Sequence, residues 1–481
     1  MKTRAMLVFA VVGIVLTGCF SRIESLPSTA GPAVFAPLPD PEPELLVGVA
    51  ISGGGSRAAV FAAGVLEELA RTRITGPAGE RSLLEKVHFM SSVSGGSLAT
   101  AYYAALKPPK TEPVLGDRDG LSLKYQEFFE AYRAAMQENF ERSALFRQML
   151  FFRAFNPTKL AHSLAEVWDE KFFHGMTFAT LYERERRGDS PRVILNGTSY
   201  NSGKRFALTT LPPAAFDYDI VGRLIPYFKE RLGPKVTPEG LAIIVENLTR
   251  ARERLLPLTF EQIEADHQNL RLALGVATSA SFPPIVGPVT YSVAGRPGYQ
   301  HIGDGGLFDN LGTESLTTMF LNRMALDSTK RMRALIIVID AAYPFDVDKR
   351  SLNETKKGYT VFSDDPSRIV GIMEERANAY QLLLWDALRT QGVVLPSFKD
   401  LRIEVLRHIE PEWQGAPGDL PDACRDEFPG PVTPDAIRQE VTQIPTRFRV
   451  TDCHAALLIT AARKVVEKHR GRIVGFVENQ P

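Results

Sequence analysis

Residues 44–71 read ELLVGVAISGGGSRAAVFAAGVLEELAR, and this stretch decides the fold. Its first part, residues 44–52, is a nearly continuous apolar run, which is typical of a strand buried on both faces of a sheet. Three glycines follow, and apolar residues then recur at helical spacing from Val60 to Leu69. The stretch therefore predicts a strand, a tight turn and a helix.

The same pattern is repeated directly downstream. KVHFMSS, residues 86–92, predicts a second short strand, and GGSLATAYYAAL, residues 95–106, a second helix. Two successive strand–turn–helix units are typical of an α/β layered fold with a parallel sheet. Further strands are expected at 192–200, 298–305, 334–343 and, on a weaker pattern, 400–409. Further helices are expected at 121–152, 240–254, 365–389 and 452–469.

The whole-chain composition excludes some classes of function. The 481 residues contain 56 Lys and Arg against 56 Asp and Glu, so no net charge attracts the chain to nucleic acid. We find no metal-ligand spacing of Cys and His, no Walker-type phosphate loop and no fixed-period repeat. We therefore expect no nucleic-acid partner and no metal.

The N-terminus has the features of an export signal. Lys2 and Arg4 precede an apolar run that is shorter than the roughly 20 residues of a membrane span. Residues 16–19, Leu-Thr-Gly-Cys, resemble a bacterial lipobox, which implies removal of residues 1–18 and acylation of Cys19. By analogy with enterobacterial sorting, Phe20 at the next position indicates a lipid-anchored protein of the bacterial cell envelope, on the outer membrane facing the periplasm.

The Pro-rich composition of residues 19–44 predicts an extended tether rather than part of a core. We expect one large domain at 45–475, with a helical insertion at about 120–180. In an exported protein Cys424 and Cys453 could form a disulfide or remain two buried thiols, and the sequence leaves both open.

Ser94 is the candidate nucleophile. It lies in Ser92-Val93-Ser94-Gly95-Gly96, a form of the G-x-S-x-G pattern in which small neighbours allow a sharp strand-to-helix turn. The turn after the first strand offers the N–H groups of Gly53, Gly54 and Gly55 at a helix N-terminus, where an oxyanion would be stabilised.

The general base is predicted to be a carboxylate. Asp304 lies in GDGGLFDN after a predicted strand, and its glycine neighbours would let it approach a serine closely. A Ser–Asp–His triad would instead use His408, His454 or His469, none of which follows a strong strand. Asp309 and Asp340 fit helix or turn caps better than catalytic groups.

Together these motifs resemble the patatin-like phospholipase family. The resemblance rests on the order Gly53-Gly54-Gly55-Ser56-Arg57, the Ser94 elbow and Asp304-Gly305-Gly306, supported by ATSASFPPI at 277–285, and it spans about residues 47–343. The chain departs from the family pattern at two positions, which carry Ala58 and Ser92.

The resemblance implies a three-layer α/β fold with a mostly parallel sheet, helices on both faces and a helical cap. It implies a Ser94–Asp304 dyad that cleaves acyl esters of phospholipids or lysophospholipids without a cofactor. In this interpretation Gly54 and Gly55 hold the oxyanion and Arg57 fixes their loop. The supporting glycines are Gly96, Gly305 and Gly306.

Two alternatives remain open at this point: a Ser–Asp–His esterase, and an inactive lipid-binding envelope lipoprotein. Residues 142–165 contain no acidic residue and combine Arg147 and Arg153 with several phenylalanines. This composition fits a buried cap helix with snorkelling arginines, or a surface for anionic lipid.

Overall fold

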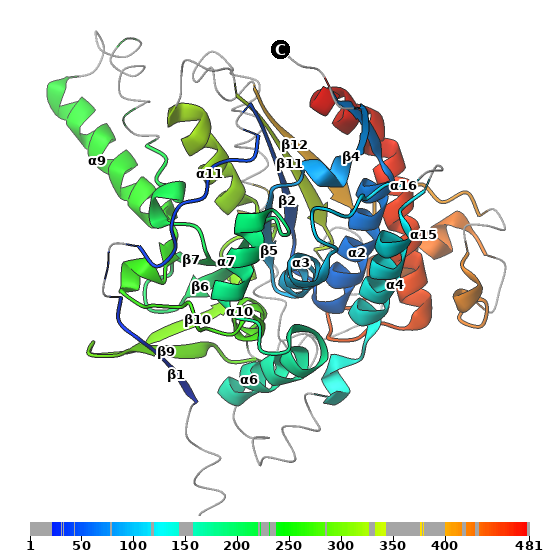
Figure 1. The fold of residues 1–481 in the computed structure, drawn as a ribbon, viewed down its shortest axis with the longest axis horizontal. Helices are drawn as coiled ribbons and strands as arrows, with labels where there is room; N and C mark the ends of the chain where they lie inside the picture. The colour runs from blue at the N-terminus through cyan, green and yellow to red at the C-terminus, as the bar shows by residue number, and fades with distance from the viewer. Residues whose placement is uncertain are drawn as a thin grey trace, which may run out of the picture.

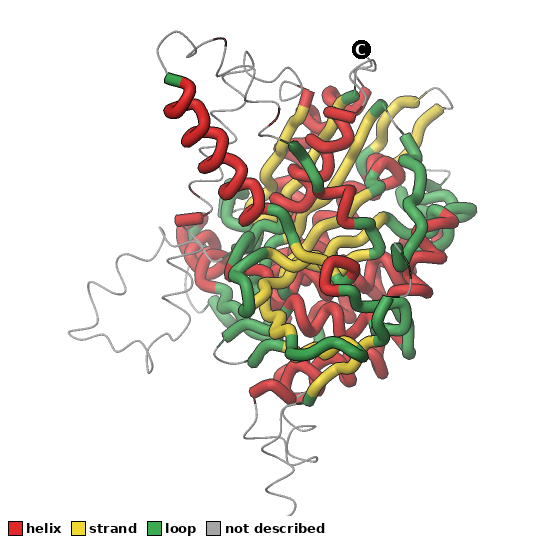
Figure 2. The backbone as a smooth tube through the Cα atoms, turned by 90° about the vertical axis from the view of Figure 1, so that its left-hand side faces the viewer, coloured by secondary structure: helices red, strands yellow, loops and turns green. Residues whose placement is uncertain are grey.

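The computed structural model describes residues 22–29, 31, 33–42, 44–76, 79–116, 120–143, 157–219, 222, 230, 237–283, 286–326, 332–342, 376–377, 379, 400–415, 420–428 and 432–478. Within them ten strands form one sheet. Figures 1 and 2 show this sheet running through the body. Its strands are β1 (Ile23–Leu26), β2 (Leu45–Ile51), β5 (Phe89–Val93), β6 (Arg192–Ser199), β7 (Arg205–Thr209), β8 (Leu258–Thr259), β9 (Val289–Val293), β10 (Gln300–Asp304), β11 (Arg333–Asp340) and β12 (Leu401–Arg407).

The centre of the sheet is parallel. Strands β6, β5, β2, β11 and β12 lie side by side in this order and all pair in parallel. Strand β10 pairs antiparallel with β6 and with β9, and β1 pairs in parallel with β9. The predicted α/β fold with a mostly parallel sheet is therefore confirmed. A separate two-stranded sheet consists of β3 (Arg73–Gly76) and β4 (Gly79–Ser82).

Helices cover both faces of the sheet, and alternating residues of β2 show why. Val47, Val49 and Ile51 pack into the core beneath α2 (Gly55–Arg71), α3 (Gly95–Leu106), α4 (Leu123–Gln137) and α16 (Asp452–Glu478). Leu46 and Ala50 point the other way, toward α11 (Thr313–Leu326). This two-residue alternation puts a separate hydrophobic core on each face, which makes the body three-layered.

Most predicted elements match. The predicted strands at 192–200, 298–305, 334–343 and 400–409 are β6, β10, β11 and β12, and the predicted helix at 240–254 is α9 (Pro238–Leu255). The helix expected at 121–152 is interrupted: α4 ends at Gln137, Glu138 is extended, and residues 140–143 are helical again. The helix expected at 365–389 and most of the basic, aromatic stretch at 142–165 lie outside the described residues.

The remaining helices include α6 (Pro157–Trp168), α7 (Phe178–Arg187), α10 (Leu272–Ser279) and α15 (Pro434–Gln443). Helix α9 buries no residue and stands at the margin of the body in Figure 1. In the part of the chain that is described, no helix combines the length and apolarity needed to cross a membrane.

The Pro-rich segment packs on the body, which differs from the prediction of a tether without core contacts. Leu26 in β1 is buried, and the buried Phe35 stacks on Tyr182 at 5.0 Å between ring centroids. Asp40 forms ion pairs with Arg192 and Arg323. Composition missed this because a few apolar and charged side chains anchor the segment despite its prolines. Cys19 and the signal segment lie outside the described residues.

Candidate functional site

Ser94 occupies a strained turn between β5 and α3. Its backbone has φ 54° and ψ −124°, a region that non-glycine residues seldom adopt. The turn is sharp, as the small neighbours of Ser94 predicted, and it lifts a half-buried side chain off the end of a buried strand. Strain of this kind persists only where the surrounding structure holds it in place.

A buried polar network holds the elbow from below. The Ser94 N–H donates to the carbonyl oxygen of Ser279 at 3.1 Å and to its Oγ at 3.2 Å. The Ser279 hydroxyl in turn donates to the carbonyl of Asn196 at 2.5 Å and lies 2.8 Å from Ser97 Oγ. The Asn196 amide donates to the Ser92 carbonyl at 2.9 Å. Local motifs did not single out Asn196, whose role depends on contacts far away in sequence.

The sheet register explains why Asp304 meets Ser94. Strand β7 pairs with β6 along one edge, over β6 residues 194–198. The strands β5 and β10 therefore share the other edge, and Val93 pairs with Asn196 while Asp304 pairs with Gly197. Because β5 is parallel and β10 antiparallel to β6, their C-terminal ends point at each other. Ser94 and Asp304 lie where these two ends meet.

Burial dominates the electrostatics of Asp304, which is 1% exposed. Desolvation raises the pKa of its carboxyl to about 7, against opposing hydrogen bonds from the Gly306 N–H and the Ser94 side chain. Oδ1 accepts from Gly306 at 2.8 Å. Among the described residues Oδ2 has no partner of standard hydrogen-bond geometry, although the Ser94 side chain lies close enough to lower the pKa of the carboxyl. Such contacts commonly tighten when substrate binds.

The glycine loop lies beside Ser94. A Cβ on Gly53 would be 3.5 Å from the Ser94 Cβ. Gly54 and Gly55 have φ of 140° and 60°, which suits glycine. The Gly53 N–H already donates to the Asn310 carbonyl at 2.9 Å. Of the three predicted oxyanion donors, this leaves the N–H groups of Gly54 and Gly55. For their two N–H groups the described part of the chain shows no partner.

Close backbone contacts require glycine at the supporting positions. A Cβ on Gly95 would strike the carbonyl of Gly55, so the elbow and the glycine loop are in direct backbone contact at these two residues. A Cβ on Gly96 would lie 2.5 Å from the Ser52 carbonyl oxygen. A Cβ on Gly305 would lie 2.5 Å from the Asn196 carbonyl oxygen. These glycines let three loops approach more closely than side chains would allow.

Arg57 fixes the base of the glycine loop. Its guanidinium is fully buried and donates to the carbonyls of Ala341 at 2.8 Å and Ile444 at 2.5 Å. It also donates to Thr446 Oγ1 at 3.0 Å. These bonds tie the start of α2 to two segments remote in sequence.

The three histidines of the alternative triad interact with other groups. His408 is buried against the Asp340 carbonyl, at 3.3 Å from Nδ1, and desolvation lowers its pKa to about 3. His454 Nε2 lies 2.7 Å from Glu440 Oε1. His469 lies between Glu404 and Glu410, whose hydrogen bonds raise its pKa. No interaction that the described residues show joins these rings to Asp304.

The two other candidate carboxylates are caps, as the sequence indicated. Asp309 accepts from the N–H groups of Leu311, Gly312 and Glu314 at the start of α11. Asp340 accepts from the Ala342 N–H in the turn after β11.

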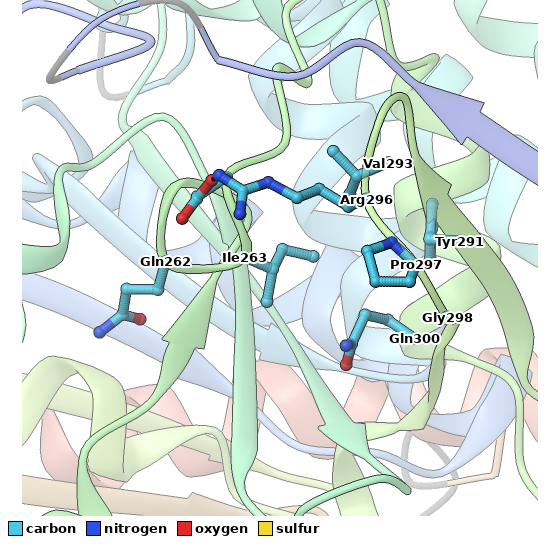
Figure 3. A pocket seen from close by; sticks show the side chains of 9 residues that line it. Gln262, Ile263, Tyr291, Val293, Arg296, Pro297, Gly298 and Gln300 are labelled. Carbon is cyan, nitrogen blue, oxygen red and sulfur yellow. Dashed lines mark ion pairs between the residues drawn. The ribbon is translucent and has the colours of Figure 1, made fainter.

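Two other features lie apart from the Ser94 site. An open pocket of about 310 Å³ lies between the β9–β10 turn and residues 262–264 (Figure 3). Arg296 of the turn forms an ion pair with Glu264. Glu427, Glu440 and His454 have potential ligand atoms within 4.8 Å of one another. None of these residues belongs to the elbow, the glycine loop or the Asp304 turn.

Comparison with known proteins gives a family match. The family model described as patatin-like phospholipase matches residues 49–317, which contain Ser94, Asp304 and the glycine loop. No protein of curated function matches the chain.

Two solved structures of human GIVD cytosolic phospholipase A2 are similar at low identity. One has 12% identity and a TM-score of 0.42, with 90% of this chain and 60% of that chain covered. The other, in complex with methyl gamma-linolenyl fluorophosphonate and terbium chloride, has 13% identity and a TM-score of 0.43, with 92% and 60% covered. The alignments thus span less than two thirds of the human protein's length.

Proposed function

This chain belongs to the patatin-like phospholipase family, whose model covers more than half of it, and we propose that it is a serine acyl hydrolase with a Ser94–Asp304 dyad. The proposed substrates are fatty-acyl esters of phospholipids or lysophospholipids. The observation that carries the proposal is the end-on meeting of β5 and β10, which places the strained serine beside a buried carboxylate.

The proposed reaction has two halves. Ser94 Oγ attacks the ester carbonyl carbon while Asp304 accepts the hydroxyl proton, and the N–H groups of Gly54 and Gly55 stabilise the oxyanion. The intermediate collapses, and the alcohol leaves with the proton from Asp304, which gives an acyl-Ser94 ester. Water then attacks this ester, Asp304 takes its proton, and collapse releases the fatty acid and returns the proton to Ser94.

A pKa of about 7 suits this role. A carboxylate with an ordinary pKa is a weak base toward a serine hydroxyl, whereas burial makes Asp304 more basic while leaving a large fraction ionised near neutral pH. The partners of His408, His454 and His469 support the dyad over a triad.

The test is product analysis with the purified full chain on phosphatidylcholine and lysophosphatidylcholine in mixed micelles. We expect the parent to release fatty acid. The rate of release should fall at least about 10³-fold in Ser94→Ala and in Asp304→Asn. The surface variant Ser202→Ala is the matched control. Labelling of Ser94 by a fluorophosphonate, mapped by peptide mass spectrometry, is expected in the parent. Fatty-acid release that survives Ser94→Ala contradicts the dyad.

Substitution of the three histidines separates the dyad from a triad. We expect His408→Gln, His454→Gln and His469→Gln each to retain turnover within about threefold when folded. Loss of turnover in one folded variant would favour the Ser–Asp–His esterase.

The lipid anchor at Cys19 is a further part of the proposal, supported by the lipobox-like residues 16–19. Metabolic labelling with a radioactive fatty acid should mark the parent and not Cys19→Ser. Absence of label from the parent contradicts an anchored envelope protein.

A further inference from the structure

Residues 444–447 connect α15 to α16 and lie well beyond the family match at 49–317. Their sequence is Ile-Pro-Thr-Arg, and we call them the 444–447 strap. The strap lies against the glycine loop, although nearly 400 residues of chain separate the two.

The strap contacts the backbone of the glycine loop directly. The Ser56 N–H, in the first turn of α2, donates to the Arg447 carbonyl at 2.7 Å. A Cβ on Gly55 would strike the same carbonyl, so the Arg447 peptide fills the space beside Gly55. The strap therefore limits where the backbone of one proposed oxyanion donor can move.

Two more hydrogen bonds reach the strap from Arg57. Its Nη1 donates to the Ile444 carbonyl and its Nη2 to Thr446 Oγ1, at 2.5 and 3.0 Å. Hydrogen bonds from a charged donor in a buried site are stronger than neutral ones. The strap thus contacts Gly55, Ser56 and Arg57, on the α2 side of the turn that presents Gly54 and Gly55.

The strap is itself anchored on its far side. Ile444 is fully buried in the core. The next residue, Phe448, binds the segment that follows α4. Its carbonyl accepts from the Phe140 N–H at 3.0 Å, and its N–H donates to Glu141 Oε1 at 3.2 Å. Pro445 restricts the backbone between these contacts. A strap fixed at both ends can hold a loop in place.

We propose that the 444–447 strap is a positioning element that sets the geometry of the Gly54 and Gly55 N–H groups for oxyanion binding. The inference rests on the proposed function, because it assigns these amides to the oxyanion. It adds that a segment outside the family region completes the site. Oxyanion donors act only when they are held close to their ideal position, so a loose strap lowers turnover more than substrate binding.

The test compares Thr446→Val with Thr446→Ser, because only serine restores the hydroxyl that accepts from Arg57. We expect Thr446→Val to lower kcat by about five- to tenfold with KM within twofold, and Thr446→Ser to recover most of the loss. Pro445→Gly should lower kcat similarly by loosening the strap. The control is Thr451→Val, which removes a hydroxyl that accepts from the His454 N–H at the start of α16.

Hydrogen–deuterium exchange of a peptide spanning residues 53–57 gives a readout independent of activity. Faster exchange in Thr446→Val and Pro445→Gly than in Thr451→Val supports the inference. Exchange and kcat equal to the parent in both variants overturn it, while Ser94-dependent hydrolysis by the parent would leave the proposed function standing. Parent protein without Ser94-dependent hydrolysis refutes the proposed function, and with it the oxyanion role of the strap.

Discussion

The N–H of Ser94 donates to both oxygen atoms of Ser279, at 3.1 Å to the carbonyl and 3.2 Å to Oγ. Two residues further on, the carbonyl of Ser281 accepts from the N–H of Asp304 at 3.1 Å. The turn that ends α10 therefore fixes the backbones of both proposed dyad residues. The distance between Ser94 and Asp304 is set by this single turn as well as by the sheet.

Removal of the Ser279 hydroxyl should weaken the hydrogen bonding that positions the Ser94 backbone. In Ser279→Ala the Ser94 N–H keeps the carbonyl acceptor but loses Oγ, and the Asn196 carbonyl loses its donor. We expect kcat to fall about tenfold, because one buried hydrogen bond contributes roughly 1–1.5 kcal/mol. Steady-state kinetics and the rate of fluorophosphonate labelling measure this.

The control is Ser190→Ala, which removes another buried hydroxyl, bonded to the Pro191 carbonyl away from the elbow. Equal kinetic losses in the two variants would show that Ser279 contributes only to general stability.

The activity should depend on the ionisation of Asp304. As the base it must be deprotonated, and burial raises its pKa to about 7. We expect kcat/KM to rise with pH and to level off above about pH 8. A profile measured from pH 5 to 9 with a neutral ester checks this, and a profile that is flat through pH 7 contradicts it.

The same carboxyl should make the fold less stable as pH rises. Its pKa rises from an ordinary 3.8 to about 7 on folding, so between these values the folded chain binds a proton that the unfolded chain releases. The stabilisation is complete below about pH 4 and is lost as pH rises through 7. Asp304→Asn, which cannot ionise, should therefore raise Tm at pH 8 more than at pH 5. An equal change in Tm at both pH values contradicts the raised pKa.

Contact between the elbow and the glycine loop should be sensitive to a single methyl group. Gly95→Ala would drive a Cβ into the Gly55 carbonyl, so we expect a loss of stability of more than about 2 kcal/mol and of most activity. Gly475→Ala is the matched control, since its Cβ meets open space in α16 and should be neutral or slightly stabilising. Denaturant unfolding and turnover measure both, and a neutral Gly95→Ala would refute the close contact.

The parts of the fold that were predictable have local signals. The apolar run of β2, the glycines after it and the spacing of α2 are contiguous in sequence, and the small residues around Ser94 mark its turn. The pairing that joins Ser94 to Asp304 has no such signal. The sequence predicted a mostly parallel sheet, whereas β10 runs antiparallel to β6 and meets β5 end to end on the edge of β6.

Long-range supports were also missed for a physical reason. Asn196 acts through hydrogen bonds to residues 83 to 119 positions away, which no spacing pattern encodes. Phe35 has no aromatic neighbour in the adjacent Pro-rich sequence, and its burial depends on contacts with distant residues such as Tyr182. In both cases the role of the residue depends on contacts with residues distant in sequence, which local composition does not reveal.

The cysteine pair, which the sequence left open, is a disulfide between Cys424 and Cys453, both fully buried. It closes a separation of 29 residues and fastens the loop before α15 to the start of α16. We expect Cys424→Ser with Cys453→Ser to lower the free energy of unfolding by about 2–4 kcal/mol, because the unfolded chain regains the freedom that the bond removes.

In the native parent neither cysteine should react with a thiol reagent until a reductant is added, as peptide mapping would show. Modification of both thiols in unreduced protein would instead establish two free cysteines. The double variant should also lose some turnover, since the 444–447 strap ends five residues before α16 begins.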